Sequence, residues 1–322
     1  MSVQINKPLN LAFLGCGFAT SLHSRTISRI DKSVKRFYAS RDKKKAALYN
    51  QKFGGAGYFD SYSAAIDTPK IDAVLVATPP AQHLLLALQG LQADKHVIVE
   101  KPPFLHSSDF EKVIKESKKA DKKVLVAENY YYKPLAVKLR QILKQGLIGE
   151  VLFIQVNALK LQKTGDWRDN ASLAGGGALY EGGVHWVNFM ASLGYSLSEV
   201  NGFQPGNSKG ADRSYLVSFK YAEGPVGALF YSWEIPSLFK GLRISRIYGK
   251  EGSITFESNG LFIIVKGKRK KIILPGFSDI AGYKALFRDF FESLRTGDEP
   301  LYTLELAQKD LELIEKIYSS AK

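Results

Sequence analysis

The stretch Leu11-Ala12-Phe13-Leu14-Gly15-Cys16-Gly17-Phe18-Ala19-Thr20 decides the fold of this chain. Its first four residues form a short, wholly apolar run, which is typical of a strand buried on both faces. The two glycines suit a tight turn after that strand, in which the backbone can approach a pyrophosphate. A helix expected over residues 21–30 would add N–H donors and the positive end of its dipole. Thr20 stands where the usual fingerprint has its third glycine. The prediction of a dinucleotide-binding loop therefore depends on the position of the two glycines directly after a strand.

The first 125 residues repeat this alternation of strand and helix. Continuous apolar runs predict strands at 11–14, 37–39, 73–77, 96–99 and 124–127. Helical patterns follow them at 21–30, 42–53, 82–93 and 107–120, with Ser107 or Ser108 as the expected N-cap of the last. Apolar runs without a period of two need cover on both faces, as in a parallel sheet. Residues 1–125 therefore predict an α/β domain of the doubly wound Rossmann type.

The rest of the chain has a different periodicity. Tyr215, Val217, Phe219 and Tyr221 recur at every second position, the pattern of a half-buried strand. Further short strands are expected at 227–234, 244–248, 253–256, 261–265 and 271–274, and helices at 283–295 and 304–318. Residues 126–322 therefore predict an α+β domain with a largely antiparallel open sheet, for substrate binding and oligomerisation.

Composition limits the class of protein. The chain has 322 residues, of which 45% are hydrophobic and 24% charged, so it can bury cores for about two domains. A single cysteine, Cys16, fits a reducing compartment. The N-terminus lacks the features of an export signal, so we expect a cytoplasmic protein. The formal charge of +14 points to an anionic partner without saying which.

The cofactor contacts are expected at the first two strand ends. On the glycine loop they are Gly15, Gly17, Phe18 and Ala19, and after the second strand Ser40 and Arg41. NAD enzymes usually place an acid at the second strand end to hold the ribose hydroxyls. Arg41 occupies that place here and suits a 2′-phosphate, which favours NADP. The alternative is that Arg41 lies on the surface and Asp42 serves the ribose of NAD.

The next two strand ends carry Thr78-Pro79, with His83 after them, and Glu100-Lys101-Pro102. Ligands of open α/β sheets bind outside the carboxyl ends of the strands, which places these residues at the cofactor. A lysine beside an apolar cofactor ring could hydrogen-bond a substrate hydroxyl. The competing interpretation is an ordinary solvated lysine at a strand end.

A glycine-rich segment in the second half brings an acid and a base together. In Gly175-Gly176-Gly177-Ala178-Leu179-Tyr180-Glu181-Gly182-Gly183-Val184-His185, Glu181 and His185 are four residues apart and share a face if the segment is helical. A histidine can take a hydroxyl proton while hydride leaves the same carbon. The competing interpretation is a buried histidine bonded to backbone, beside a solvated glutamate.

Together these motifs resemble the Gfo/Idh/MocA family of pyridine-nucleotide oxidoreductases. The resemblance runs almost end to end: the Gly-Cys-Gly loop with His23, Asp72-Ala73-Val74 before Thr78-Pro79, Glu100-Lys101-Pro102, Gly146-x-Ile148-Gly149-Glu150, Trp167-Arg168, Gly183-x-His185 and Glu305-x-Ala307. It implies that Lys101 is the active-site lysine and His185 the catalytic acid/base. The resemblance also implies a catalytic role for Glu181. It does so less directly, because the family usually has aspartate at this position.

The resemblance also implies the substrate class and the assembly. Family members act on a hydroxyl or ketone of a sugar, cyclitol or sugar nucleotide, and the open sheet commonly forms homodimers or homotetramers. The residues expected to contact substrate are Tyr130, Trp167, Arg168, Glu181 and His185. Because the chain is basic, an anionic substrate is attractive, and the profile is similar to that of a UDP-N-acetylglucosamine 3-dehydrogenase.

Two alternative functions share this fold: a catalytically silent cofactor-binding regulator and a redox-assisted glycosidase. Retention of both Lys101 and His185 argues against the regulator. Nucleic-acid binding is not expected, because the lysine groups lie on helix faces or in one turn at 266–271 and lack interleaved aromatics. No Cys/His cluster has metal-ligand spacing, so no metal is expected.

Overall fold

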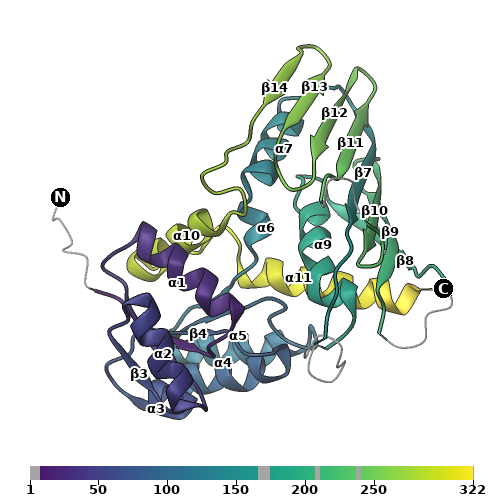
Figure 1. Ribbon diagram of the computed structural model, residues 1–322. Helices are drawn as coiled ribbons and strands as arrows, with labels where there is room; N and C mark the ends of the chain where they lie inside the picture. The colour runs from purple at the N-terminus through teal and green to yellow at the C-terminus, as the bar shows by residue number, and fades with distance from the viewer. Residues whose placement is uncertain (1–7, 166–174, 207–210, 237–240, 322) are drawn as a thin grey trace. The chain divides into compact units, whose positions relative to one another are not determined.

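A computed structural model describes residues 8–165, 175–206, 211–236 and 241–321 (Figure 1). The chain forms two compact units. The first comprises Met1–Glu128 with Tyr283–Gln308, and the second Asn129–Gly282 with Lys309–Lys322. No helix within the described ranges is both long and apolar enough to cross a membrane.

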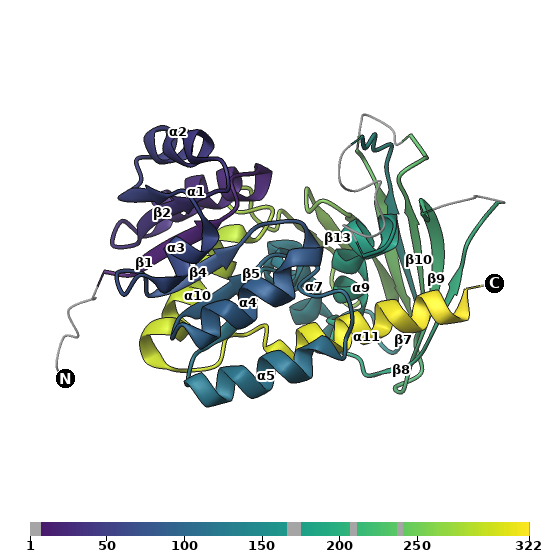
Figure 2. The ribbon, with the colours of Figure 1, turned by 90° about the horizontal axis from the view of Figure 1, so that it is seen from below.

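The first unit is built on a parallel sheet of six strands in the order β3-β2-β1-β4-β5-β6. The strands are β1 (Asn10–Leu14), β2 (Lys35–Ala39), β3 (Gly57–Phe59), β4 (Ala73–Val76), β5 (His96–Val99) and β6 (Val124–Val126). The helices are α1 (Phe18–Ile30), α2 (Lys43–Phe53), α3 (Tyr62–Asp67), the 3₁₀ turn η1 (Pro80–Gln82), α4 (His83–Gln92), α5 (Asp109–Ala120) and α10 (Tyr283–Thr296). In Figure 2, α1 and α2 lie on one face of this sheet and α4 and α5 on the other. Strand order reverses between β1 and β4, the arrangement that opens a ligand crevice at the carboxyl ends.

The parallel fold class predicted for this unit is confirmed, and all five expected strands are present. Two elements were not expected from the sequence. β3 has only three residues, none fully buried, and α3 has six. Neither carries the continuous apolar run by which the other strands were predicted. Ser108 is the N-cap residue of α5, but its backbone is helical and its side chain makes no capping hydrogen bond.

The two units divide the chain differently from the predicted boundary at residues 125 and 126. The segment Tyr283–Gln308, expected in the second domain, belongs to the first unit. α10 buries Phe287 and Phe290 completely, and the rings of Tyr283 and Phe287 meet His23 of α1 edge-on at 5.4 and 5.0 Å. Arg295 at the end of α10 also pairs with Asp31. Periodicity shows that a helix has an apolar face but not which core receives it.

The second unit is built on eight strands in the order β14-β13-β12-β11-β7-β10-β9-β8. They are β7 (Val151–Leu159), β8 (Leu197–Phe203), β9 (Ser214–Tyr221), β10 (Val226–Ser232), β11 (Ile244–Gly249), β12 (Gly252–Glu257), β13 (Ile263–Lys266) and β14 (Lys271–Ile273). Strands β7 and β10 pair in parallel and the other neighbours antiparallel, which confirms the largely antiparallel sheet. β7 and β8 were not predicted from the sequence.

The helices of the second unit carry the functional segment. They are α6 (Asn129–Tyr132), α7 (Pro134–Lys144), the π-helical turn η3 (Leu179–Gly183) and α9 (Val184–Ala191). α11 (Leu304–Ser320) begins in the first unit, and its residues from Lys309 on belong to the second. One face of the sheet is buried through alternate residues such as Val217, Leu229 and Ile247. The alternate positions of β7 and β10 leave apolar side chains exposed, including Phe153, Val226 and Phe230.

Candidate active site

The glycine loop between β1 and α1 has the geometry of a pyrophosphate cradle. Gly15 has a φ of +113°, and a Cβ there would lie 2.7 Å from the Ala77 carbonyl oxygen, so only glycine fits. Around Gly17, by contrast, a Cβ would meet nothing within 4 Å. Gly17 is also the N-cap of α1 and no side chain caps this helix. The first-turn N–H groups and the positive end of the helix dipole are therefore open to an anion.

Thr20, which replaces the third glycine of the fingerprint, stabilises the glycine loop. Its hydroxyl donates to the Gly15 carbonyl at 2.7 Å, and the side chain is fully buried. The loop is tied from outside as well, because the Tyr49 hydroxyl donates to the Gly17 carbonyl at 3.2 Å. Of the other expected contacts on this loop, Phe18 is 80% exposed and Ala19 half-buried. Burial raises the pKa of the Cys16 thiol to about 11, so this cysteine stays protonated and is a poor nucleophile.

At the end of β2, Arg41 and Asp42 have different surroundings. Asp42 is the N-cap of α2, and one carboxylate oxygen accepts the N–H groups of Lys44 and Lys45 at 2.9 and 3.3 Å. The exposed Arg41 side chain interacts with the Tyr62 hydroxyl, whose pKa is nevertheless raised by burial. Ser40 is buried and its hydroxyl accepts the N–H of Asp42 at 3.1 Å. Helix capping thus engages Asp42, while the charge of Arg41 faces solvent.

A buried contact between a histidine and a carboxylate lies directly before Lys101. Glu100 follows β5 and pairs through Oε1 with Nε2 of His23 from α1, while its other oxygen accepts the Lys101 N–H at 3.1 Å. The His23 side chain is fully buried. Burial alone would raise the pKa of Glu100, but the His23 ring and the Lys101 charge hold it below its ordinary value. Glu100 therefore anchors the backbone that carries the half-buried Lys101.

His83 holds the neighbouring loops together. It is 1% exposed, its Nδ1 lies 3.0 Å from the Pro102 carbonyl oxygen, and its Nε2 lies 2.8 Å from that of Thr78. Burial lowers the pKa of His83, so the ring is neutral and only one nitrogen carries a proton to donate. The expected cofactor residues Thr78 and Pro79 are half-buried at the same strand end. His83 links them to the segment after Lys101.

In the second unit, Glu181 and His185 lie on the continuous helical segment formed by η3 and α9. Glu181 falls in the π-helical turn and His185 in the first turn of α9. The expected helical segment is therefore present, but its first turn is wider than an α-helix. Such π-turns are rare and are often found at functional sites.

Two residues distant in sequence cap the start of this segment. The Asp212 carbonyl accepts the Ala178 N–H at 2.8 Å, and its carboxylate accepts the Leu179 N–H at 2.8 Å. The Tyr318 hydroxyl donates to the same carboxylate at 2.7 Å and accepts the Tyr180 N–H at 3.2 Å. A Cβ on Gly177 would lie 2.1 Å from the Asp212 carboxylate, which explains a glycine there. Asp212 and Tyr318 thus satisfy the amide groups that a helix N-terminus leaves unpaired.

His185 lies in an aromatic stack. The Tyr130 ring from α6 is nearly parallel to the imidazole, with centroids 4.4 Å apart and an angle of 12°. Trp186 meets Tyr130 edge-on at 5.1 Å. The Lys133 ammonium, whose side chain is 96% buried, lies 4.2 Å from the centre of the Tyr130 ring. Stacking of this kind fixes the plane of the imidazole.

Of the three adjacent tyrosines, Tyr130 is the one seen to stack on His185. The Tyr131 ring packs under Arg140, whose guanidinium carbon is 4.6 Å from the ring centre, and Tyr132 is buried in the core. Trp167 and Arg168, also expected to contact substrate, lie outside the described residues. The sequence did not indicate Lys133, Asp212 or Tyr318 as site residues. Only Lys133 had a visible signal, its position beside the tyrosines.

Comparison with known proteins agrees with this geometry. Residues 9–128 match the family model described as an oxidoreductase family with an NAD-binding Rossmann fold, and residues 136–255 match the GFO/IDH/MocA C-terminal domain. The chain belongs to the Gfo/Idh/MocA family.

Two curated family members illustrate the range of similarity. A dTDP-3,4-didehydro-2,6-dideoxy-alpha-D-glucose 3-reductase of Saccharopolyspora spinosa is 31% identical over 71% of this chain and 70% of its own length. Levoglucosan dehydrogenase of Pseudarthrobacter phenanthrenivorans is 25% identical over 95% of this chain and 87% of its own. A solved structure of levoglucosan dehydrogenase with NADH superimposes with a TM-score of 0.86 at 21% identity, covering 97% of this chain and 96% of that one.

This family member is therefore an NAD-binding oxidoreductase, and its glycine loop fits a dinucleotide. The open space at Gly17 and the uncapped N-terminus of α1 are where a pyrophosphate would bind. Among the residues that the structure describes, no group of three His, Cys, Asp or Glu side chains could hold a metal ion.

The His23–Glu100 pair predicts a pH-dependent loss of stability. Because the folded pKa of Glu100 is depressed, its stabilisation is present above the ordinary value of 4.5 and is lost as the pH falls through the folded value. Glu100→Gln should lower the free energy of unfolding by about 3 kcal/mol at pH 7. Urea unfolding should show this difference shrinking below pH 4.5. The control Glu299→Gln removes the exposed partner of Lys123 and should cost less than about 1 kcal/mol. An unchanged profile in Glu100→Gln would contradict the assignment.

The cap on η3 predicts a positioning role for Tyr318. Tyr318→Phe should lower kcat by about tenfold with little change in KM, because small displacements of reacting groups are costly. The control Tyr221→Phe removes another buried tyrosine hydroxyl, which donates at 3.0 Å to the Met190 carbonyl at the other end of α9. It should lower the melting temperature to a similar extent and leave kcat within about twofold. Equal kcat values in the two variants would show that the cap contributes to stability alone.

Proposed function

We propose that this protein transfers hydride between a nicotinamide cofactor and a secondary hydroxyl or ketone of a sugar ring. The observation that carries the proposal is the fixed imidazole of His185, stacked on Tyr130 and presented by a capped π-turn. The names of the relatives support a sugar, since one is a levoglucosan dehydrogenase and another a dTDP-sugar 3-reductase. The reductase name points to position 3 as the first carbon to test.

In the oxidation direction the roles of the protein groups follow from their chemistry. The glycine loop and the uncapped N-terminus of α1 would hold the dinucleotide, which would supply a hydride acceptor for the carbinol carbon. His185 accepts the hydroxyl proton as the carbon–oxygen double bond forms, which is general base catalysis. The proposed role of Lys101, in the first unit, is to donate a hydrogen bond to a substrate hydroxyl. Reduction runs through the same steps in reverse, with His185 as the acid.

Several further residues complete the proposed site. Glu181 would hold a substrate hydroxyl from the π-turn, and Tyr130 offers a ring to an apolar sugar face. Arg168 and Trp167 stay predictions for substrate contact. UDP-N-acetylglucosamine is one proposed substrate because the chain is basic, and NADP is the preferred cofactor because Arg41 presents an exposed charge at the end of β2.

We further propose a homodimer or homotetramer assembled through the open face of the second unit's sheet. Val226 of β10 lies opposite Phe153 of β7, and they are 45% and 58% exposed. Phe230 on the same strand is 38% exposed. A contiguous apolar sheet face of this kind is typical of an interface between subunits.

The catalytic roles are tested by replacing each group with an inert one. Lys101→Met and His185→Asn should each lower kcat/KM by about a thousandfold, while NADH affinity changes less than about twofold. Matched controls are Lys115→Met and His106→Asn, which replace exposed residues of the first unit. The substrate panel should contain levoglucosan, methyl glucosides, myo-inositol and UDP-N-acetylglucosamine, each with NAD and NADP. Wild type that binds NADH without turning over any of them would favour a silent regulator. Glycoside cleavage without net reduction of cofactor would favour a redox-assisted glycosidase.

Cofactor preference is tested at Arg41. Arg41→Gln should lower kcat/KM for NADP by about tenfold relative to NAD, because it removes a charge-assisted donor to the 2′-phosphate. Lys43→Gln, which removes another exposed charge at the start of α2, should change this ratio by less than about twofold. A wild type equally efficient with both cofactors would contradict the NADP preference.

A further inference from the structure

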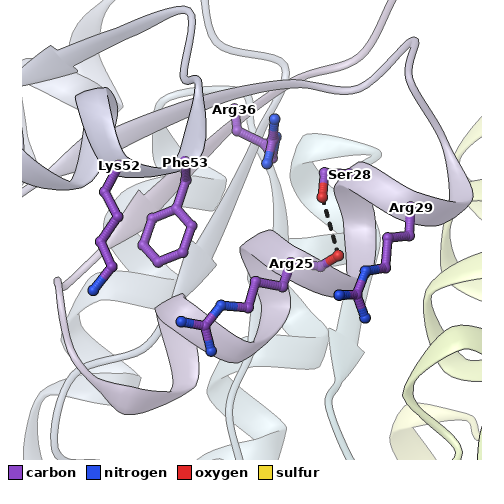
Figure 3. Close-up of a pocket in the computed structure, with 6 residues that line it drawn as sticks. All are labelled: Arg25, Ser28, Arg29, Arg36, Lys52 and Phe53. Carbon is purple, nitrogen blue, oxygen red and sulfur yellow. Dashed lines mark hydrogen bonds between the residues drawn. The ribbon is translucent and has the colours of Figure 1, made fainter.

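A cationic pocket opens on the surface of the first unit (Figure 3). The second half of α1, the start of β2 and the last turn of α2 line an open depression of about 340 Å³. Its lining consists of Arg25, Ser28, Arg29, Arg36, Lys52 and Phe53. Four of these six residues are cations and none is an acid.

Uncharged groups hold three of the four cations. Arg36 donates to the carbonyl oxygens of Ser24 at 3.0 Å and Gly54 at 3.4 Å. The Arg25 guanidinium and the Lys52 ammonium lie 5.8 and 5.6 Å from the centre of the Phe53 ring. Carbonyl dipoles and an aromatic ring position a cation without cancelling its charge. The pocket is therefore ordered and still strongly positive.

No carboxylate in the described part of the chain pairs with any of these four cations. Residues 25–53 contain ten lysines and arginines but only two acids, a net charge of +8 out of the +14 of the whole chain. Both acids have other partners, since Asp31 pairs with Arg295 and Asp42 caps α2. Arg25 and Arg29 are four residues apart on α1, where like charges repel. An anion bound between them would relieve this repulsion.

Helix dipoles account for only part of the cluster. Arg29 and Lys52 lie in the last turns of α1 and α2, where the dipole favours a cation. Arg25 lies more than a turn before the end of α1, and Arg36 is on a strand. Neither gains from a helix terminus, so a common ligand explains the group better than the dipoles do.

The pocket is distinct from the proposed cofactor site. Arg36 is the second residue of β2, whereas the glycine loop bonds to the carboxyl end of that strand through Gly15 N–H and the Ala39 carbonyl. Three residues of extended strand separate the two by about 10 Å. Arg29 is likewise about 18 Å along α1 from its N-cap Gly17.

We propose that this pocket binds a small phosphorylated ligand, a phosphate ester or diphosphate, at a second site of the enzyme. Guanidinium groups recognise phosphate oxygens through paired hydrogen bonds, and three arginines converge here. The volume lies at the lower end of the range for small-molecule pockets, which suits one or two phosphate groups with a small organic part. A single depression, rather than a track along the surface, does not match a nucleic-acid strand.

The test measures pyrophosphate and glycerol phosphate binding to the full-length protein by calorimetry at 150 mM salt. Saturating NADH keeps the dinucleotide site filled. Wild type should bind one equivalent, and Arg25→Gln/Arg29→Gln should weaken binding by about tenfold or more. Glutamine keeps helix propensity and both sites are exposed, so folding is expected to be retained. Phenylglyoxal labelling should modify Arg25 and Arg29, and pyrophosphate should protect both.

The matched control is Lys115→Gln/Lys118→Gln, which removes two exposed charges from α5 of the same unit. It should leave affinity within about twofold, since these charges are screened from the pocket. Equal losses of affinity in the two double variants would overturn the proposal in favour of general charge attraction. Absence of saturable binding to the wild-type protein would overturn it as well. A single-stranded DNA oligonucleotide that binds more tightly than pyrophosphate through the same two arginines would replace it with a nucleic-acid surface.

Discussion

The first unit depends on a buried contact between His23 and Glu100. It joins α1, which begins at the glycine loop, to the end of β5, from which Lys101 extends. Tyr283 and Phe287 of α10 pack edge-on against the imidazole, so the pair also contacts a helix from far along the chain. A charge in such a place is tolerated only when it is paired, because desolvation penalises an isolated carboxylate. The contact that anchors the lysine backbone therefore also packs against α10 of the same unit.

In the second unit, unreactive side chains likewise hold the residues proposed for the chemistry. A helix start has unpaired N–H groups, and Asp212 and Tyr318 satisfy them at the beginning of the segment that carries Glu181 and His185. The aromatic stack with Tyr130 then sets the plane of the imidazole. In both units a residue suited to proton transfer or hydrogen bonding is held by side chains that do not themselves react. Preorganisation of this kind lowers the cost of reaching the reactive geometry.

The positive charge of the chain has a local explanation. More than half of the net +14 lies within residues 25–53, a segment that includes Arg41 and the cationic pocket. Lysines on α5 do not share this concentration, and some of them pair with acids on the same helix. The overall charge predicted an anionic partner, and the fold gathers the charges into places where a phosphate could bind.

The family followed from the resemblance of several motifs. The sequence by itself determined the parallel sheet, the glycine loop and the antiparallel sheet. Each of these depends on local patterns: apolar runs, alternation, and glycines placed directly after a strand. It also predicted Lys101, Glu181 and His185 as the residues suited to the chemistry. Only the tertiary structure decided that Glu100 pairs with His23, that His83 links two loops and that Asp212 and Tyr318 cap the π-turn. Apart from His83 and Thr78, which are five residues apart, these partners are 19 to 138 residues apart along the chain, so no sequence period connects them. The same holds for the cationic pocket, because residues from a helix, a strand and a second helix become one site only when the sheet brings them together.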